Sequence, residues 1–165
     1  MDSELKINPK FTAHLAKDNP FISGGLRTYR EYRDLGIADA TDGEIHAHIV
    51  RTTAPCPPEG SGIHYHDLDF QLVYVLSGSS RIWFEGQGEY FFEAGDCWLQ
   101  PPSIRHHVIE YSDDYELLEI TMPSTDGGSR EPKPTGTNPG TSSVSKSLRR
   151  DIFKCSESVT QQNAL

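Results

Sequence analysis

Residues 64–78 read HYHDLDFQLVYVLSG, with two histidines at the start, a run of strand-forming residues and a glycine at the end. His64 and His66 stand two positions apart, and side chains at that spacing lie on one face of an extended chain, with Cβ atoms about 6–7 Å apart. Two imidazoles so placed can bind one metal ion at about 2.0–2.1 Å from each nitrogen. Four residues separate His66 from Gln71, and six more separate Gln71 from Gly78. The stretch therefore predicts a pair of metal ligands followed by a strand and a tight turn.

Short runs of strand-forming residues lie on both sides of this stretch. They are four to eight residues long, and Gly, Pro or Ser residues separate them. This arrangement is typical of an antiparallel sandwich or barrel. We predict strands over residues 45–52, 69–76, 80–85, 89–92, 97–100, 106–111 and 116–122. No helix of ten or more residues is predicted between positions 41 and 124, so the predicted fold class is all-β.

A second stretch, residues 95–106, reads GDCWLQPPSIRH. Together with residues 64–78 it resembles the two motifs of the cupin superfamily, G-x5-H-x-H-x(3,4)-E-x6-G and G-x5-P-x-G-x2-H-x3-N. The resemblance covers roughly residues 44–123. It implies a double-stranded β-helix, which is a jelly-roll barrel, with a metal ion inside.

The ligand set follows from the resemblance, position by position. The metal ligands would be His64, His66, Gln71 and His106. They would hold one divalent ion, and the spacing does not choose among Fe, Ni, Zn, Mn and Cu. His107 is excluded because it follows His106 directly and should face the other way along a strand.

The chain departs from the family motifs at several positions. The glycine before the first histidine is met only approximately, by Gly60, while Ser103 and Glu110 replace the glycine and asparagine of the second motif. Most important, the usual glutamate ligand is Gln71. A neutral amide leaves a divalent ion its full charge, which makes the ion a stronger Lewis acid toward a carbonyl or carboxylate.

These observations predict a metal-dependent enzyme that acts on a small molecule by redox-neutral chemistry such as isomerisation, cyclisation or dehydration. Two alternatives remain open at this stage. One is an Fe(II)-dependent cupin dioxygenase, and the other is a non-catalytic cupin that binds or senses a ligand.

Several residues outside the motifs are further candidates for the site. His46 and His48 alternate with Ile45, Ala47 and Ile49, so both histidines share one face of a strand. We predict His48 as a general acid or base, the alternative being a solvent-facing pair. Three arginines are candidates for holding a carboxylate: Arg51, Arg81 and Arg105. Cys97 is expected to be buried.

The chain divides into three predicted parts. Residues 1–40 form an irregular arm with a possible edge strand, residues 41–124 the barrel, and residues 125–165 a Gly-, Pro- and Ser-rich tail predicted to be disordered. Residues 26–35 are ambiguous between a short helix and a polar edge strand. Residues 21–37 are the candidate surface for a homodimer, because exposed edge strands are commonly covered by a partner.

Composition narrows the partners and the compartment. The net charge of −9 includes a basic tail, and residues 1–125 alone carry −11. This negative charge on residues 1–125 repels phosphate backbones, so we predict no nucleic-acid partner. Three cysteines without C-x-x-C spacing, no signal-peptide pattern and no long apolar run predict a cytoplasmic protein with no membrane partner. The resemblance to cupins implies that its partner is a small-molecule substrate.

Overall fold

The computed structural model describes residues 7–24 and 27–124 of the chain. The chain divides into two units, residues 1–133 and residues 134–165. The predicted disordered tail, residues 125–165, lies outside the described residues.

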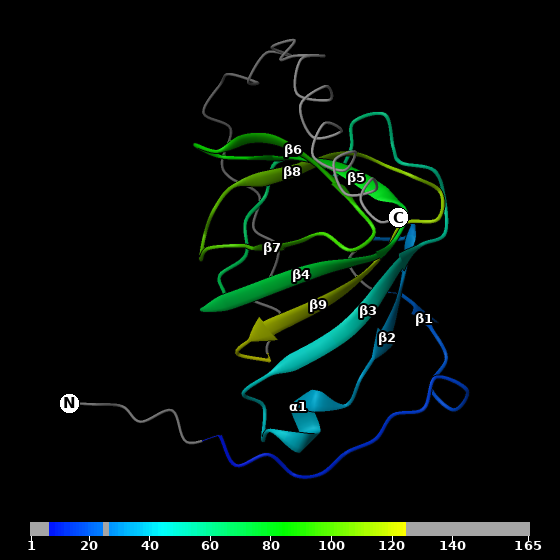
Figure 1. Cartoon of the computed structure of the whole chain (residues 1–165), viewed down its shortest axis with the longest axis vertical. Helices are drawn as coiled ribbons and strands as arrows, with labels where there is room; N and C mark the ends of the chain where they lie inside the picture. The colour runs from blue at the N-terminus through cyan, green and yellow to red at the C-terminus, as the bar shows by residue number, and fades with distance from the viewer. Residues whose placement is uncertain (1–6, 25–26, 125–165) are drawn as a thin grey trace, which may run out of the picture. The chain divides into compact units, whose positions relative to one another are not determined.

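Two antiparallel sheets form the described unit (Figure 1). The six-stranded sheet has the order β1-β2-β3-β9-β4-β7, and the three-stranded sheet has the order β6-β5-β8. The strands of the larger sheet are β1 (Ile22–Ser23), β2 (Arg30–Asp34), β3 (His46–Thr52), β4 (Phe70–Ser77), β7 (Cys97–Leu99) and β9 (Glu116–Met122). Those of the smaller sheet are β5 (Ser79–Phe84), β6 (Gly88–Glu93) and β8 (His106–Tyr111). The prediction of an all-β fold is confirmed.

The seven strands predicted between positions 45 and 122 are all present, with boundaries that agree to within one residue. The ambiguous segment 26–35 contains strand β2, which pairs with β3 from Arg30↔Thr52 to Asp34↔His48. His64 and His66 were expected on one face of an extended chain, but they do not belong to a full strand. His64 instead forms an isolated antiparallel bridge with His106.

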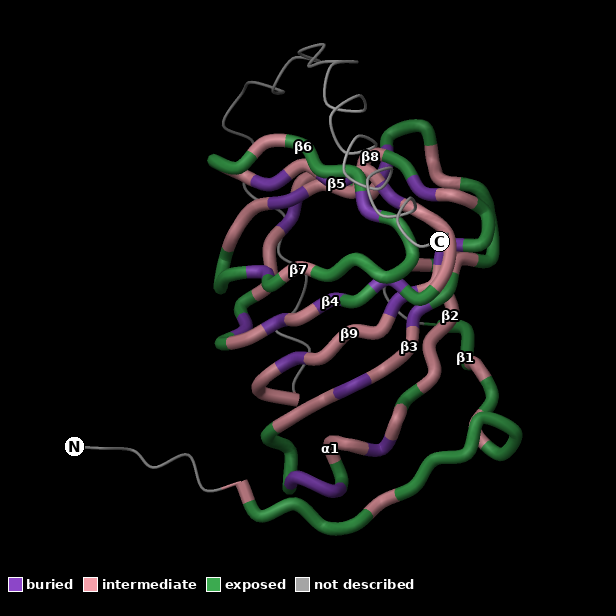
Figure 2. Tube along the Cα trace, viewed as in Figure 1, coloured by how far each residue is buried: buried purple, intermediate pink, exposed green. Residues whose placement is uncertain are grey.

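The core lies between the two sheets. Alternate residues of β4 and β5 are buried, and Figure 2 shows buried and less buried positions alternating along these strands. One face of each sheet thus removes apolar side chains from water. The buried cluster combines Val50, Val73, Val75 and Leu117 of the larger sheet with Ile82, Phe84, Phe92 and Tyr111 of the smaller one, together with Tyr115.

Gly78 forms the turn between β4 and β5, where the cupin motif requires a glycine. Its φ is 70°, which side-chain-bearing residues rarely adopt. A Cβ at this position would also lie 2.8 Å from the Cα of Tyr115. Both the backbone conformation and the space therefore select glycine, and this turn places β4 and β5 in different sheets.

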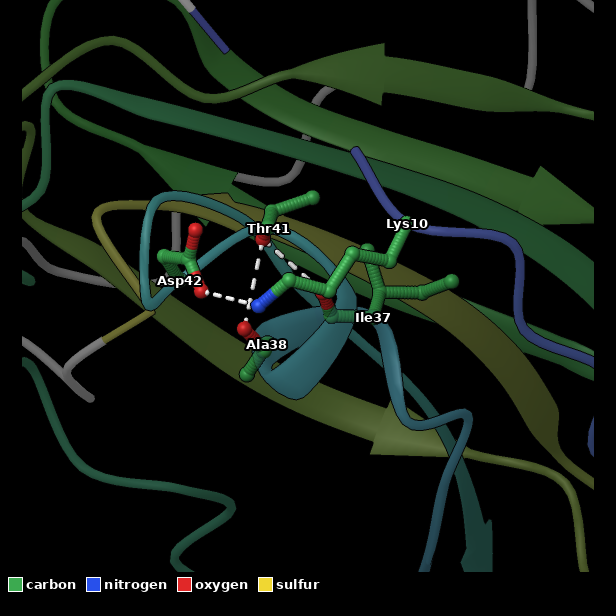
Figure 3. Close-up of polar contacts among 5 residues, drawn as sticks. All are labelled: Lys10, Ile37, Ala38, Thr41 and Asp42. Carbon is green, nitrogen blue, oxygen red and sulfur yellow. Dashed lines mark hydrogen bonds and ion pairs between the residues drawn. The ribbon is translucent and has the colours of Figure 1, made fainter. Parts of the chain in front are cut away.

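The N-terminal arm is attached to α1 (Ile37–Ala40), a four-residue helix beside the larger sheet (Figure 3). The Lys10 ammonium donates to the Asp42 carboxylate at 2.6 Å, and the Lys10 amide donates to the Ala40 carbonyl at 2.7 Å. The Thr41 hydroxyl donates to the Ile37 carbonyl at 2.8 Å. Within the described residues, no helix is long and apolar enough to cross a membrane.

Candidate metal centre

Three histidines from distant parts of the sequence meet between the sheets. His64 and His66 precede β4, and His106 begins β8. The backbones of His64 and His106 hold each other by two hydrogen bonds, of 3.0 and 2.9 Å. One ring nitrogen from each of the three histidines lies within 4.8 Å of the others, which is close enough for all three to bind one ion.

Backbone carbonyls fix the orientation of two of these rings. His64 Nδ1 lies 2.9 Å from the Gly62 carbonyl oxygen, and His106 Nδ1 lies 3.1 Å from the Ile104 carbonyl oxygen. A carbonyl only accepts, so each Nδ1 carries the proton and donates it. The Nε2 atoms of His64 and His106 are therefore unprotonated and can bind a metal ion, as is usual for histidine ligands. His106 Nε2 also lies 3.5 Å from Gln100 Nε2, at the outer limit of a hydrogen bond.

The protein environment keeps these histidines neutral. Burial, together with the neighbouring His106, lowers the pKa of His64 to about 3. Burial is also the main cause that lowers the pKa of His106 to about 4, and it lowers the pKa of His66. Only a neutral imidazole has a lone pair to give to a metal ion. The three side chains thus fit a divalent ion in geometry, tautomer and charge.

Gln71, the predicted fourth ligand, lies in the same cavity but has hydrogen-bond partners there. Its amide oxygen accepts from Gln100 Nε2 at 2.7 Å, and its amide nitrogen donates to the Glu119 carboxylate. A carbonyl oxygen has two lone pairs, so one remains for a metal ion. Coordination by Gln71 stays a prediction.

Glu119 is a carboxylate in the cavity that the sequence analysis did not identify. His48 Nε2 lies 2.7 Å from Glu119 Oε2, and both side chains are largely buried, with exposed fractions of 16% and 21%. Burial raises the pKa of Glu119, but the hydrogen bond and charge of His48 and the amide of Gln71 outweigh it and lower the pKa to about 2. Glu119 is therefore ionised at neutral pH.

A cavity of about 70 Å³ adjoins the three histidines. Its lining residues include Glu119 but not His48, which therefore reaches the site through the carboxylate that it binds. Apart from the three histidines, Gln71 and Glu119, the lining consists of Arg27, Arg30, Ser61, Val73, Ile82, Trp98, Gln100, Val108, Tyr115 and Leu117.

Other predicted residues lie elsewhere. His107 is not among the lining residues, as expected from its position next to His106. The three arginines proposed from sequence for a carboxylate are bound to carboxylates of the protein: Arg51 to Glu31, Arg81 to Glu110 and Glu89, and Arg105 to Glu85. Cys97 is exposed rather than buried, because the neighbouring Trp98 takes the inward position on β7.

The missed residue Glu119 did have a signal in the sequence. Leu117 and Thr121 share its side of strand β9, and both are buried. An acidic side chain at the inward position between them was the clue. The register of β3 and β9, which places His48 opposite Glu119, was not readable from the sequence.

The described unit is thus an antiparallel two-sheet barrel with a buried group of three histidines. Residues 52–121 match the family model of the Cupin domain. This match lies within the barrel and agrees with the resemblance of the two sequence motifs to those of cupins.

Solved structures share the fold at low sequence identity. The polyketide cyclase RemF from Streptomyces resistomycificus is 15% identical, with a TM-score of 0.57 over 74% of this chain and 85% of that one. KdgF from Halomonas sp. is 16% identical, with a TM-score of 0.53 over 68% and 94% of the two chains. An RmlC-like cupin from Shewanella frigidimarina is 16% identical, with a TM-score of 0.52 over 72% and 96%. No curated protein matches the sequence.

Proposed function

We propose that this chain is a metal-dependent enzyme that performs redox-neutral chemistry on a small carbonyl or carboxylate compound, by isomerisation, cyclisation or dehydration. One observation carries the proposal: three neutral imidazoles converge beside a cavity that also contains an ionised carboxylate. His64, His66 and His106 would hold one divalent ion, with Gln71 as the fourth ligand through its remaining lone pair.

The bound ion would polarise a carbonyl or carboxylate oxygen of the substrate as a Lewis acid. The four proposed ligands are uncharged, so none of them reduces the positive charge of the ion. The carboxylate of Glu119 is held one hydrogen bond away from this ligand set by the amide of Gln71. This arrangement supports Lewis-acid chemistry, because the negative charge is near the ion without being bound to it.

Redox-neutral chemistry on a carbonyl compound also requires a group that accepts a proton. Glu119 lines the cavity and is ionised, so we assign it this role. Its low pKa makes it a weak base, so the proton that it accepts must be one that the bound ion would make acidic. His48 binds Glu119 Oε2 and fixes the direction of the carboxylate. The catalytic role predicted for His48 from the sequence thus becomes a positioning role, carried out through Glu119.

Fe(II)-dependent dioxygenation is the second candidate, because a set of three histidines also suits Fe(II). RemF, a polyketide cyclase with the same fold, illustrates that such a barrel can carry cyclisation, which supports the first candidate.

The two candidates differ in a measurable way. Protein loaded with Zn²⁺, Ni²⁺ or Fe²⁺ is incubated with pyruvate or acetylacetone in D₂O, and loss of the C–H signals next to the carbonyl is followed by NMR. We expect exchange above that of His106→Ala, without oxygen consumption. Oxygen consumption by the iron form without exchange would instead establish the dioxygenase. Absence of both would leave a ligand-binding cupin.

Gln71→Glu tests whether an uncharged ligand set makes the bound ion a stronger Lewis acid. This substitution adds one negative charge to the ligand set and should slow the exchange by at least about tenfold, a change of about 1.4 kcal/mol in the barrier. The matched control is Gln87→Glu, which adds the same charge at an exposed position and should leave the rate unchanged. Equal or faster exchange in Gln71→Glu contradicts the Lewis-acid argument.

A further inference from the structure

Two arginines that line the cavity lack the carboxylate partner that Arg51, Arg81 and Arg105 have. Arg33 also forms no ion pair among the described residues, but it does not line the cavity. Arg27 and Arg30 line the cavity together with the three histidines. Among the described residues neither forms an ion pair, whereas Arg51, Arg81 and Arg105 are each bound to glutamate. The Arg30 Nε is buried without a hydrogen-bond partner within that part of the chain. A buried guanidinium donor without a partner is costly, which indicates a place for an acceptor.

Arg27 and Arg30 both lie on the cavity side of the larger sheet. Arg30 is the first residue of β2 and shares the strand face of Tyr32, which packs against the core. Its backbone amide donates to the Arg27 carbonyl at 3.1 Å, so a tight turn holds the two residues together. Burial is the main cause that lowers the pKa of His64, His66 and His106, and the positive charge of Arg27 contributes to each of these shifts.

The charges that line the cavity do not balance. Two guanidinium groups face one carboxylate, and that carboxylate, Glu119, is already bound by His48 and Gln71. The surplus is positive, although residues 1–125 carry a net charge of −11. A divalent ion on the histidines would increase the surplus further. A positive cavity in an acidic protein selects an anion by local contacts rather than by the overall charge.

We propose that Arg27 and Arg30 bind the carboxylate of a small organic acid that occupies this cavity. The proposal rests on the proposed function and narrows its substrate class to carboxylic acids. A guanidinium group matches a planar carboxylate by two parallel hydrogen bonds.

The test measures binding to the metal-free protein, so that it does not depend on metal chemistry. Chelator-treated protein is titrated with ¹³C-labelled pyruvate, and the dissociation constant is obtained from NMR line widths. Pyruvamide, which has the same shape without the charge, and inorganic phosphate serve as comparison ligands. We expect wild-type protein to bind pyruvate more tightly than either comparison ligand.

The variants are Arg27→Gln and Arg30→Gln, with Arg51→Gln as the matched control on the surface. Loss of one charged hydrogen-bond donor pair should weaken pyruvate binding by at least about tenfold in each cavity variant and not in the control. Arg30→Lys keeps the positive charge but loses the two parallel N–H donors of the guanidinium group. Its affinity for pyruvate should lie between those of Arg30→Gln and wild type. Circular dichroism verifies that each variant is folded, and Arg27 lies in a turn outside the strands, where substitution is best tolerated.

Several results would overturn the inference: no wild-type binding of pyruvate, equal binding of pyruvamide, tighter binding of phosphate, or unchanged binding in both cavity variants. The metal content of the same proteins is measured separately. A wild-type protein that binds pyruvate but no metal ion contradicts the proposed function and leaves the arginine subsite standing. A wild-type protein that binds a metal ion but not pyruvate contradicts the arginine subsite and leaves the proposed function standing.

Discussion

The buried histidines make the stability of the metal-free barrel depend on pH in a range where few other groups titrate. His64 and His106 have exposed fractions of 7% and 5%, and their pKa values of about 3 and about 4 lie well below the ordinary value of 6.5. The unfolded chain takes up protons on both histidines as the pH falls below 6.5, whereas the folded protein does not. Stability is therefore complete above pH 6.5 and is lost as the pH falls toward 4.

The magnitude follows from the number of protons taken up. Each histidine contributes about 1.4 kcal/mol per pH unit once the unfolded form is fully protonated. The two together should lower the free energy of unfolding by roughly 4 kcal/mol between pH 7 and pH 5, a large part of the stability of a typical domain. Carboxylates with lowered pKa values, such as Glu119, add little in this range because their unfolded forms titrate near pH 4.5.

The assay is urea unfolding of chelator-treated protein at pH 7, 6 and 5, followed by circular dichroism. His106→Gln keeps a hydrogen-bonding side chain but removes the titration, so its stability should fall by roughly 2 kcal/mol less over the same range. The control is His14→Gln at an exposed position, where the pH dependence should equal that of wild type. The reasoning is refuted if His106→Gln and wild-type protein lose the same free energy between pH 7 and pH 5.

Three further predictions concern the barrel itself. Ser103 has a φ of 58°, so Ser103→Gly should raise the free energy of unfolding by about 0.5–1 kcal/mol in urea titrations, and a decrease would contradict it. Gly78→Ala should lower it by at least about 2 kcal/mol, because its Cβ would meet Tyr115, and a loss under about 0.5 kcal/mol would show that the turn adapts. The exposed Cys97 thiol should react faster with Ellman reagent than the Cys56 thiol, because burial raises the pKa of Cys56. Cys97→Ser should therefore remove a fast-reacting thiol and Cys56→Ser should not, and equal reaction rates of the two thiols would contradict this prediction.

The fold was predictable because its signals are local. Alternation of apolar and polar residues, with turns at positions such as Gly78, gave the strands of the barrel to within one residue. The meeting of His64, His66 and His106 was predictable through the joint spacing of the two cupin motifs. The ring orientations were not, since they depend on the carbonyls of Gly62 and Ile104.

The rest of the site depends on pairings that a sequence does not reveal. We propose a positioning role for His48 in place of the predicted catalytic one because the register of β3 with β9 places it opposite Glu119. The arginines of the cavity, Arg27 and Arg30, come from a segment whose secondary structure was ambiguous, and only its pairing with β3 shows their direction. Arg51 looked equally suitable in sequence but binds Glu31 outside the cavity.

The metal content of the purified protein shows whether His64, His66 and His106 hold one metal ion. Wild-type protein, His106→Ala and His107→Ala are purified without added metal and analysed by inductively coupled plasma mass spectrometry. His107 is the matched control, since it is the next residue on β8 and is absent from the cavity lining. We predict close to one divalent ion per chain in wild type and His107→Ala, and at least about a tenfold loss in His106→Ala. A wild-type protein without metal, or equal losses in the two variants, would contradict the account.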